Sequence, residues 1–264
     1  MSVLPTRYFA KIETDQTFLG QATHESHYGD NLIEDSCRID LDKGRSIIYL
    51  NENDACVDEL LPHLLKLKFT KAERKASKQW SKLFGGVPAG INKSSHCSRG
   101  GVINQNSDLH NLLCNKYGRW MTSLLNDYLS PWLKIGKKFL AVNPIHDDYI
   151  MYDGIHTSGI INKNNEMLYH MDTENRKHMY SAMIVYKKDV SGGYLVFPEY
   201  GFAVKLSNRS VILFYGKGLI HGVTPTIKHS KNAYRFSVVF YTMDKLQKCE
   251  EFNKEIQKAI DKAL

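Results

Sequence analysis

The pattern of apolar and polar positions changes character halfway along the chain. Residues 53–83 and 107–130 carry apolar side chains at helical spacing, which predicts helices in the first half, the second with Ser107 as its N-cap. From residue 139 onward, short runs rich in Val, Ile, Phe and Tyr are separated by Gly-Gly or Asn-Arg-Ser turns. Such runs are typical of strands. The last segment, 244–264, has the pattern of a charged amphipathic helix.

Most of the expected strands lie in the second half of the chain. RYFAKIE and RSIIYLN are strand-like near the N-terminus, and later strands are predicted in FLAVNPI, GIHTSGIIN, MYSAMIVYKK, GYLVFPEYGFAVKL, SVILFYGKGLIHG and YRFSVVFYTM. The order predicts an α+β fold, with a double-stranded β-helix (jelly-roll, cupin-like) core flanked by N-terminal helices. We expect one domain over 1–264, made of a helical and loop region (1–138), the jelly-roll core (139–243) and a C-terminal helix (244–264).

Composition restricts the class of protein further. The chain has 264 residues, of which 42% are hydrophobic, so it can bury a sizeable core. Its net charge of +7 favours polyanionic partners. The five cysteines form no CxxC pair, which predicts reduced thiols in an intracellular compartment, nuclear or cytoplasmic, and argues against a zinc site. No apolar leader or membrane-spanning run is present, so we expect a soluble protein that is not secreted.

A basic segment and a glycine-rich segment follow each other before the middle of the chain. Residues 66–82 carry seven Lys or Arg side chains, with Trp80 among them, which fits either a phosphate-facing surface or a solvated Lys-rich face. The segment 85–101 predicts an irregular loop that either lines a site or serves as a mobile connector. Lys93 and Arg99 in this loop could contact a phosphate or a carboxylate.

The stretch YHMDTENRKH contains a His-x-Asp pair, His170 and Asp172. Residues i and i+2 of an extended strand point the same way, so both side chains can reach one ion. His221, in LIHGVTP, would add a second imidazole from another strand. Two imidazoles and one carboxylate form the facial triad that holds non-haem Fe(II) and leaves coordination positions open. The alternative is an ordinary surface hydrogen bond between His170 and Asp172, with His221 in a turn.

A candidate carboxylate-binding residue follows on the next strand. Arg235 lies 14 residues after His221 (235 − 221 = 14), in YRFSVVFY. A guanidinium there could bind the carboxylate of a cosubstrate through a two-pronged hydrogen bond. A purely structural Arg235 is the alternative, although a buried Arg needs an anionic partner.

Taken together, HMDTEN…MIVY…GGYLVFPEYGFAV…VILFYGKGLIHGVTP…YRFSVVFY resembles the catalytic core of the TET/JBP family, over about residues 140–243. Members of this family are Fe(II)- and 2-oxoglutarate-dependent dioxygenases that oxidise the methyl group of 5-methylcytosine or thymine in DNA. The resemblance implies Fe(II) and 2-oxoglutarate as cofactors, O2 as cosubstrate, and DNA as a partner whose base is flipped into the pocket. We expect a monomer.

The resemblance also implies which residues bind iron and the cosubstrate. His170, Asp172 and His221 would be the iron ligands and the catalytic residues. Arg235 would pair with the distal carboxylate of 2-oxoglutarate, with Ser237 beside it on the same strand face.

Base recognition is implied for residues outside this set. Asn175 would hydrogen-bond the Watson–Crick edge of the flipped base and Tyr241 would line it, while Arg99 is expected as a third substrate contact. Asn175 as a turn residue and Tyr241 as a core residue are the alternatives. Met243 stands where the animal enzymes have a base-contacting His, and their Cys-rich zinc region is absent, so the choice between 5-methylcytosine and thymine stays open.

The expected reaction is oxidation of 5-methylcytosine to 5-hydroxymethylcytosine and beyond. One alternative is a 2-oxoglutarate-dependent hydroxylase that acts on thymine, a nucleotide, a small metabolite or a protein side chain. Another is a non-catalytic jelly-roll binding module, against which the complete HxD…H…R set argues. A halogenase is disfavoured, because Asp172 occupies the position that must be small there to admit halide.

Overall fold

The computed structural model describes residues 3–14, 17–51, 55–69, 71–74, 77–91 and 94–263. These residues form two compact units. The first unit contains Met1–Ser81, Ile161–Thr173 and Ala182–Val238, and the second contains Lys82–Ile160, Glu174–Ser181 and Val239–Leu264. A single functional domain over 1–264 stays a prediction.

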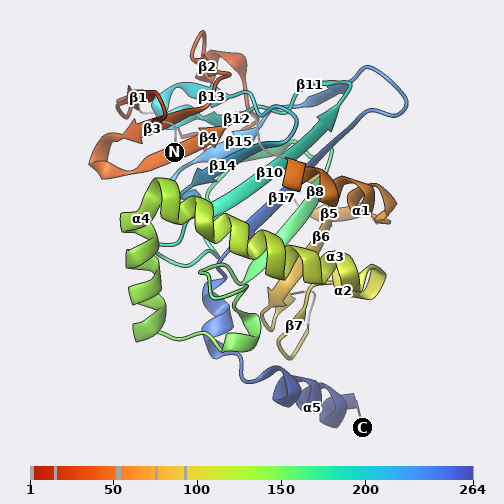
Figure 1. Cartoon of the computed structure of the whole chain (residues 1–264). Helices are drawn as coiled ribbons and strands as arrows, with labels where there is room; N and C mark the ends of the chain where they lie inside the picture. The colour runs from red at the N-terminus through yellow and green to blue at the C-terminus, as the bar shows by residue number, and fades with distance from the viewer. Residues whose placement is uncertain are drawn as a thin grey trace. The chain divides into compact units, whose positions relative to one another are not determined.

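A large sheet and a smaller sheet make up most of the first unit (Figure 1). The strand order of the large sheet is β1 (Thr6–Phe9), β3 (Cys37–Leu41), β4 (Ser46–Leu50), β14 (Ser210–Phe214), β10 (Ser181–Lys188), β17 (Tyr234–Tyr241), β8 (Ser158–Lys163), β6 (Ser77–Val87) and β5 (Lys71–Arg74). The smaller sheet has the order β2 (Leu32–Ile33), β13 (Phe202–Val204), β12 (Leu195–Phe197), β15 (His221–Val223) and β9 (Met167–His170). A separate ribbon pairs β11 (Val190–Gly192) with β16 (Thr226–Lys228).

Apolar side chains join the two sheets of the first unit. Phe197 of β12 lies with its ring centroid 6.1 Å from that of Phe214 on β14 and 5.0 Å from that of Phe202 on β13. All three side chains are buried, because a sheet with one apolar face must cover that face. Antiparallel pairing predominates in both sheets, which agrees with the predicted jelly-roll core.

The second unit contains most of the helical structure. Its helices are α2 (Val102–Gln105), α3 (Ser107–Leu112), a π-helical turn (Leu113–Tyr117), α4 (Gly118–Val142) and α5 (Phe252–Ala263), with 3-10 turns at Asp147–Tyr149 and Asp244–Lys248. β7 (Ser98–Arg99) pairs with the end of β6. The N-cap of α3 is Asn106, not Ser107 as predicted, since the Asn106 side chain accepts the backbone N–H of Leu109.

Helix α4 runs further than the sequence pattern suggests. Leu129 has non-helical dihedral angles just before Pro131, and helical structure then continues to Val142. The prediction of a strand over FLAVNPI (139–145) is therefore wrong, because FLAV is the last turn of α4. Four apolar residues in a row fit a buried strand and a helix end equally well.

The predicted N-terminal helix over 53–83 is only partly present. A 3-10 segment, Ala55–Leu60, leads into α1 (Leu61–Lys66), after which β5 and β6 replace the helix. β5 lies at the edge of the large sheet, where lysines prevent pairing with further strands, so a Lys-rich pattern suits this position as well as a helix face. The side chains of Lys71, Arg74 and Lys78, and all of Lys93, lie outside the described residues, so their contact with phosphate stays a prediction.

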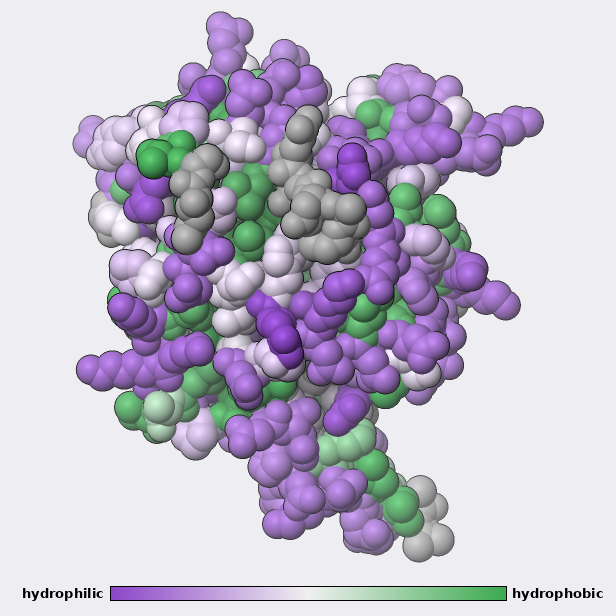
Figure 2. Space-filling view, viewed as in Figure 1, coloured by the Kyte–Doolittle hydropathy of each residue, from purple (hydrophilic) through white to green (hydrophobic). Residues whose placement is uncertain are grey.

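Charged and polar groups dominate the surface seen in Figure 2, in line with a chain that is 24% charged. Hydrophobic side chains show near the end of α5, where Ile256 and Ile260 are 42% and 48% exposed. No helix within the described ranges is both long and apolar enough to cross a membrane.

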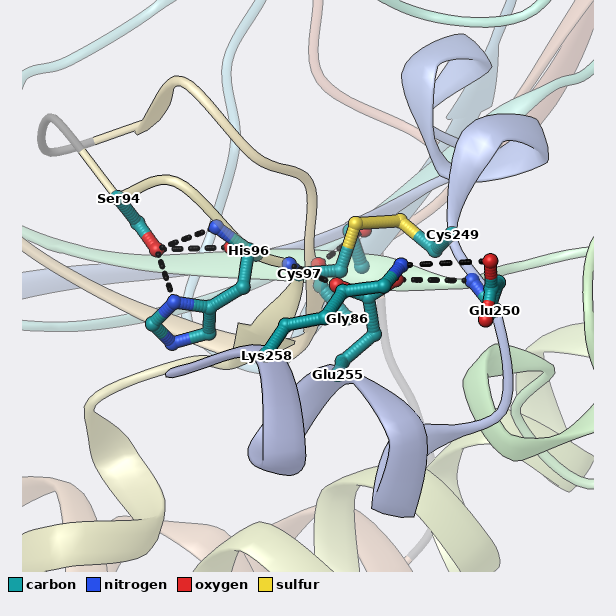
Figure 3. Close-up of a disulfide and its surroundings, with 9 residues drawn as sticks. Gly86, Ser94, His96, Cys97, Cys249, Glu250, Glu255 and Lys258 are labelled. Carbon is teal, nitrogen blue, oxygen red and sulfur yellow. Dashed lines mark hydrogen bonds and ion pairs between the residues drawn. A yellow bond between two sulfur atoms is a disulfide. The ribbon is translucent and has the colours of Figure 1, made fainter. Parts of the chain in front are cut away.

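The prediction of five reduced cysteines is wrong for one pair. Cys97 and Cys249 form a disulfide with their Cα atoms 5.9 Å apart, although 152 residues separate them in sequence (Figure 3). Cys37 and Cys114 are free, and the Cys56 side chain lies outside the described part. Spacing along the chain could not reveal the pair, because folding alone brings the two residues together. The disulfide also removes the argument from reduced thiols for an intracellular location.

Polar contacts reinforce the connection that the Cys97–Cys249 disulfide makes. The Glu255 carboxylate accepts the backbone N–H of Cys97 at 2.8 Å and that of Glu250 at 3.0 Å (Figure 3). The Lys258 ammonium lies 2.9 Å from Glu255. The loop 85–101 is thus tied to the start of α5 by covalent and charged contacts, so it is more than a mobile connector.

Replacing Cys249 by Ser should lower the free energy of unfolding by about 2–4 kcal/mol, because the open chain has more conformations when unfolded. Urea denaturation of the oxidised protein and of Cys249→Ser measures this difference. The double variant Cys97→Ser/Cys249→Ser is the control, and a reducing agent should leave its midpoint unchanged. Equal midpoints for the oxidised protein and the single variant would contradict a stabilising disulfide.

Candidate metal centre and carboxylate pocket

Two imidazoles lie next to each other on neighbouring strands of the smaller sheet. His170 ends β9 and His221 begins β15, and the two residues are direct partners in the antiparallel register. Their ring centroids are 4.4 Å apart. Each ring places Nδ1 2.8 Å from the carbonyl oxygen two residues earlier, of Leu168 and of Leu219. Donation from Nδ1–H to a carbonyl leaves Nε2 of each ring with a lone pair for a metal ion.

The Asp172 carboxylate completes a three-residue cluster. Its Oδ1 lies 3.7 Å from Nε2 of His170 and 3.9 Å from Nε2 of His221. One ligand atom from each of the three residues lies within 4.8 Å of the others, close enough to share one ion. The donor set of two imidazole nitrogens and one carboxylate oxygen fits Fe(II). A simple surface hydrogen bond between His170 and Asp172 does not account for His221.

His221 is the most enclosed member of the cluster. It is 4% exposed, and its ring centroid lies 5.1 Å from that of Phe214 and 6.3 Å from that of Phe197. Burial, aided by the neighbouring His170, lowers the pKa of His221 to about 4 despite the opposing effect of Asp172. The imidazole is therefore neutral near pH 7, which is the state that binds a metal ion.

Gly216 shapes the position of the Asp172 carboxylate. The backbone N–H of Asp172 donates to the Gly216 carbonyl at 3.0 Å. A Cβ atom built at Gly216 would lie 2.1 Å from Oδ2 of Asp172, far inside contact distance. Only glycine leaves room for this carboxylate beside the two imidazoles.

Arg235 is a buried cation in the same compact unit as the cluster. It is 2% exposed, and its Nε and Nη2 have no hydrogen-bond partner among the described residues. Burial lowers its pKa to about 10, so it stays protonated near pH 7. A buried charge without a partner is costly, so the site is suited to an anionic ligand. The distal carboxylate of 2-oxoglutarate has the matching charge and two oxygens.

Neighbouring residues hold Arg235 in place. Asn164 has a left-handed conformation (φ 53°), accepts the backbone N–H of Arg235 on Oδ1 at 2.7 Å, and donates its own N–H to the Arg235 carbonyl at 2.8 Å. A Cβ atom at Gly193 would lie 2.6 Å from Nε of Arg235, so the backbone there passes directly against the guanidinium.

Ser237 lies two residues after Arg235 on β17, and alternate residues of a strand share a face. It is 4% exposed, and its hydroxyl accepts a hydrogen bond from Nδ2 of Asn162 at 3.3 Å. The amide oxygen of Asn162 in turn accepts from Ser81 and Asn165. A role of Ser237 beside a cosubstrate stays a prediction.

The three expected substrate contacts belong to the second unit. Asn175 is 6% exposed, its Nδ2 donates to the Ser181 hydroxyl at 3.1 Å, and it forms a β-bridge with Met243. Tyr241 packs against the apolar cluster that contains Met243. Arg99 lies over the Phe252 ring at 4.6 Å and lines a cavity of about 140 Å³. Each side chain thus has a local structural contact, and its role toward a base stays a prediction.

Sequence reasoning did not identify Gly216 and Asn164. Both were visible only as turn residues, Gly216 after the apolar run VILFY and Asn164 in NKNN. Neither pattern says which distant side chain the turn must accommodate.

Gly216→Ala should weaken divalent metal binding at least about tenfold, since an added methyl group displaces the Asp172 carboxylate. Anaerobic calorimetric titration with Fe(II) measures the change. Gly101→Ala is a matched control, because a Cβ atom at Gly101 meets nothing within 4 Å. Equal metal affinity in the two variants would show that the close contact at Gly216 does not define the site.

The chain is similar in sequence to one protein family and in fold to solved structures. Residues 144–244 match the Tet_JBP family model, described as the oxygenase domain of the 2OGFeDO superfamily. The structure of NgTET1 in complex with 5mC DNA is similar to the chain, with a TM-score of 0.64 at 14% identity, covering 97% of this chain and 90% of that one. A 2OG-Fe(II) family oxidoreductase from Burkholderia pseudomallei gives a TM-score of 0.45 at 15% identity, covering 74% and 84% of the two chains. No curated protein matches the chain.

The family match spans the segment that carries His170, Asp172, His221 and Arg235, and the similarity to NgTET1 extends over nearly the whole fold. Residues 144–244 thus match the oxygenase domain of the Tet_JBP family, which is described within the 2OGFeDO superfamily.

Proposed function

We propose that the chain is an Fe(II)- and 2-oxoglutarate-dependent dioxygenase that oxidises the methyl group of 5-methylcytosine in DNA. The observation that carries the proposal is the combination of a His-Asp-His cluster with a buried Arg235, whose Nε and Nη2 bond to none of the described residues, in one compact unit. A metal-binding protein without a cosubstrate would have no need for such a cation.

The chain's own residues divide the work between holding the metal and orienting the cosubstrate. Nε2 of His170 and of His221 and the Asp172 carboxylate would hold Fe(II), since both Nδ1 atoms are occupied by carbonyl contacts. Arg235 would bind the distal carboxylate of 2-oxoglutarate, with Ser237 beside it. When bound, Fe(II) and 2-oxoglutarate supply the activation of O2 that methyl oxidation requires.

DNA is the proposed substrate for two reasons. The chain has a net charge of +7, which suits a polyanion. It also shares its fold with NgTET1, whose structure contains 5mC DNA. A base inside a duplex cannot reach an enclosed metal, so the base must leave the stack, at an unstacking cost of a few kcal/mol.

We assign recognition of the flipped base to Asn175 and Tyr241, and a contact with the DNA backbone to Arg99. Asn175 carries an amide that can both donate to and accept from a Watson–Crick edge. Met243 is the bridge partner of Asn175, so the residue that differs from the animal enzymes adjoins the proposed base contact. Oxidation of thymine is therefore the alternative that the experiment must distinguish from oxidation of 5-methylcytosine.

Mass spectrometry of nucleosides after incubation with Fe(II), 2-oxoglutarate and duplex DNA tests the proposal. DNA with 5-methylcytosine should yield 5-hydroxymethylcytosine and higher oxidation products, whereas unmethylated DNA should yield no oxidised thymine. Asp172→Ala should abolish the products, because it removes a metal ligand. Oxidised thymine without oxidised 5-methylcytosine would show that thymine is the substrate. The absence of any oxidised base in both DNAs would contradict a nucleic-acid substrate.

The same assay tests the base contact. Asn175→Ala should lower kcat/KM on methylated DNA about 10- to 100-fold, as expected for a good amide–base contact, while 2-oxoglutarate affinity stays unchanged. Ser181→Ala is the matched control, because it removes the local partner of Asn175 and leaves the amide in place. Equal losses in both variants would assign Asn175 a structural role only.

A further inference from the structure

A second cation, Lys187, lies at the same Gly192–Gly193 turn that contacts Arg235. Lys187 is on β10, and its Nζ is 3.5 Å from the Gly192 carbonyl, at the outer limit of a hydrogen bond. Burial, together with the charges of Arg235 and Lys205, lowers the pKa of Lys187 to about 8. Lys205 already has a partner, since its Nζ is 3.1 Å from the Glu34 carboxylate.

A buried hydroxyl lies at the same turn. Thr226 is the register partner of Gly192 in the β11–β16 ribbon. Its Oγ1 is buried and has no hydrogen-bond partner among the described residues. A Cβ atom built at Gly193 would lie 3.4 Å from this oxygen and 2.6 Å from Nε of Arg235. The hydroxyl and the guanidinium therefore both lie close to Gly193.

The turn Gly192–Gly193 makes this approach possible. Both glycines have left-handed dihedral angles (φ 71° and 68°), which side chains disfavour. A Cβ atom at Gly192 would lie 2.1 Å from the Pro225 carbonyl oxygen. With no side chain at either position, the backbone of this turn can pass close to the guanidinium and to the Thr226 hydroxyl.

The three groups form an incomplete polar site. The buried Arg235 and the partly buried Lys187 repel each other, and each loses hydration. No acidic side chain among the described residues bonds to Arg235 or Lys187. An anion between them would satisfy both charges and the hydroxyl at once.

We propose that Lys187 and Thr226 join Arg235 in binding the distal carboxylate of 2-oxoglutarate. This inference rests on the proposed function. A carboxylate offers about four acceptor positions on its two oxygens, and the site offers four donors: Nε and Nη2 of Arg235, the Lys187 ammonium and the Thr226 hydroxyl. Nε and Nη2 present two parallel N–H groups, the arrangement that binds a carboxylate at both oxygens. The site selects a dicarboxylate, because an oxo acid without the distal carboxylate leaves the buried Arg235 and the partly buried Lys187 without an anionic partner.

Lys187→Met should weaken 2-oxoglutarate binding to the Fe(II)-loaded protein about tenfold or more, as expected for a hydrogen bond between charged groups. Thr226→Val should weaken it severalfold, and Lys187→Arg should retain most of the affinity. The affinity for 2-oxobutyrate, which has the same chelating end and no distal carboxylate, should not change in any variant. Anaerobic calorimetry under identical conditions measures both ligands.

Lys188→Met is the matched control, since Lys188 is the adjacent lysine and is exposed. It should bind both oxo acids like the unmodified protein. Equal 2-oxoglutarate affinity in Lys187→Met and Lys188→Met would overturn the inference. So would a Lys187→Met variant that loses both ligands to the same extent, because that outcome indicates a structural role.

A metal-free measurement separates this inference from the proposed function. Glutarate should raise the Tm of the metal-free protein, and the increase should be lost in Lys187→Met. Without ligand, Lys187→Met should melt no lower than the unmodified protein, because the substitution removes a repelled charge. Absence of the glutarate shift, or an equal shift with inorganic phosphate, would overturn the assignment to a carboxylate. If the Fe(II) protein binds neither oxo acid while the glutarate result holds, the oxygenase proposal fails and the carboxylate site stands.

Discussion

The register between β9 and β15 is the constraint on which the rest of the site depends. It places His170 opposite His221, so that two Nε2 atoms from segments far apart in sequence face one point. A slip of one residue would turn one imidazole to the other face of the sheet and remove the cluster. The carbonyl contacts at Nδ1 of each ring then fix which nitrogen faces inward. Asp172 joins the pair only because Gly216 has no side chain.

Three ionisable groups of the first unit have pKa values below their ordinary ones. Burial lowers the pKa of His221 to about 4, of Lys187 to about 8 and of Arg235 to about 10. Each shift means that the folded protein disfavours the charged form of the group. Such groups are typical of functional sites, where a ligand supplies the missing partner. The neutral His221 is prepared for a metal ion, and the two cations are prepared for an anion.

Much of this arrangement was predictable because its chemistry is local in sequence. The HxD pair, the later His and the Arg on the final strand could be recognised from residue type, order and strand pattern. What could not be predicted depends on contacts between distant segments. Gly216 follows Asp172 by 44 residues (216 − 172 = 44), and Cys97 precedes Cys249 by 152. The local sequence at Gly216 or Cys97 does not predict which distant residue it will contact.

The errors in secondary structure have a related cause. The Lys-rich segment after α1 suits a helix face and an edge strand alike, and only its place beside β6 decides between them. The run FLAV likewise suits a strand and the end of α4. In both cases the neighbouring elements decide, because local propensity is weak compared with tertiary contacts.

In this view, one compact unit binds a metal ion through His170, Asp172 and His221 and a dicarboxylate through Arg235. The most direct measurement is the visible absorption spectrum of the protein mixed anaerobically with Fe(II) and 2-oxoglutarate. We expect a visible band that requires both additions and that is lost in Arg235→Met at a 2-oxoglutarate concentration saturating the unmodified protein. A spectrum without this band in the unmodified protein would contradict the account.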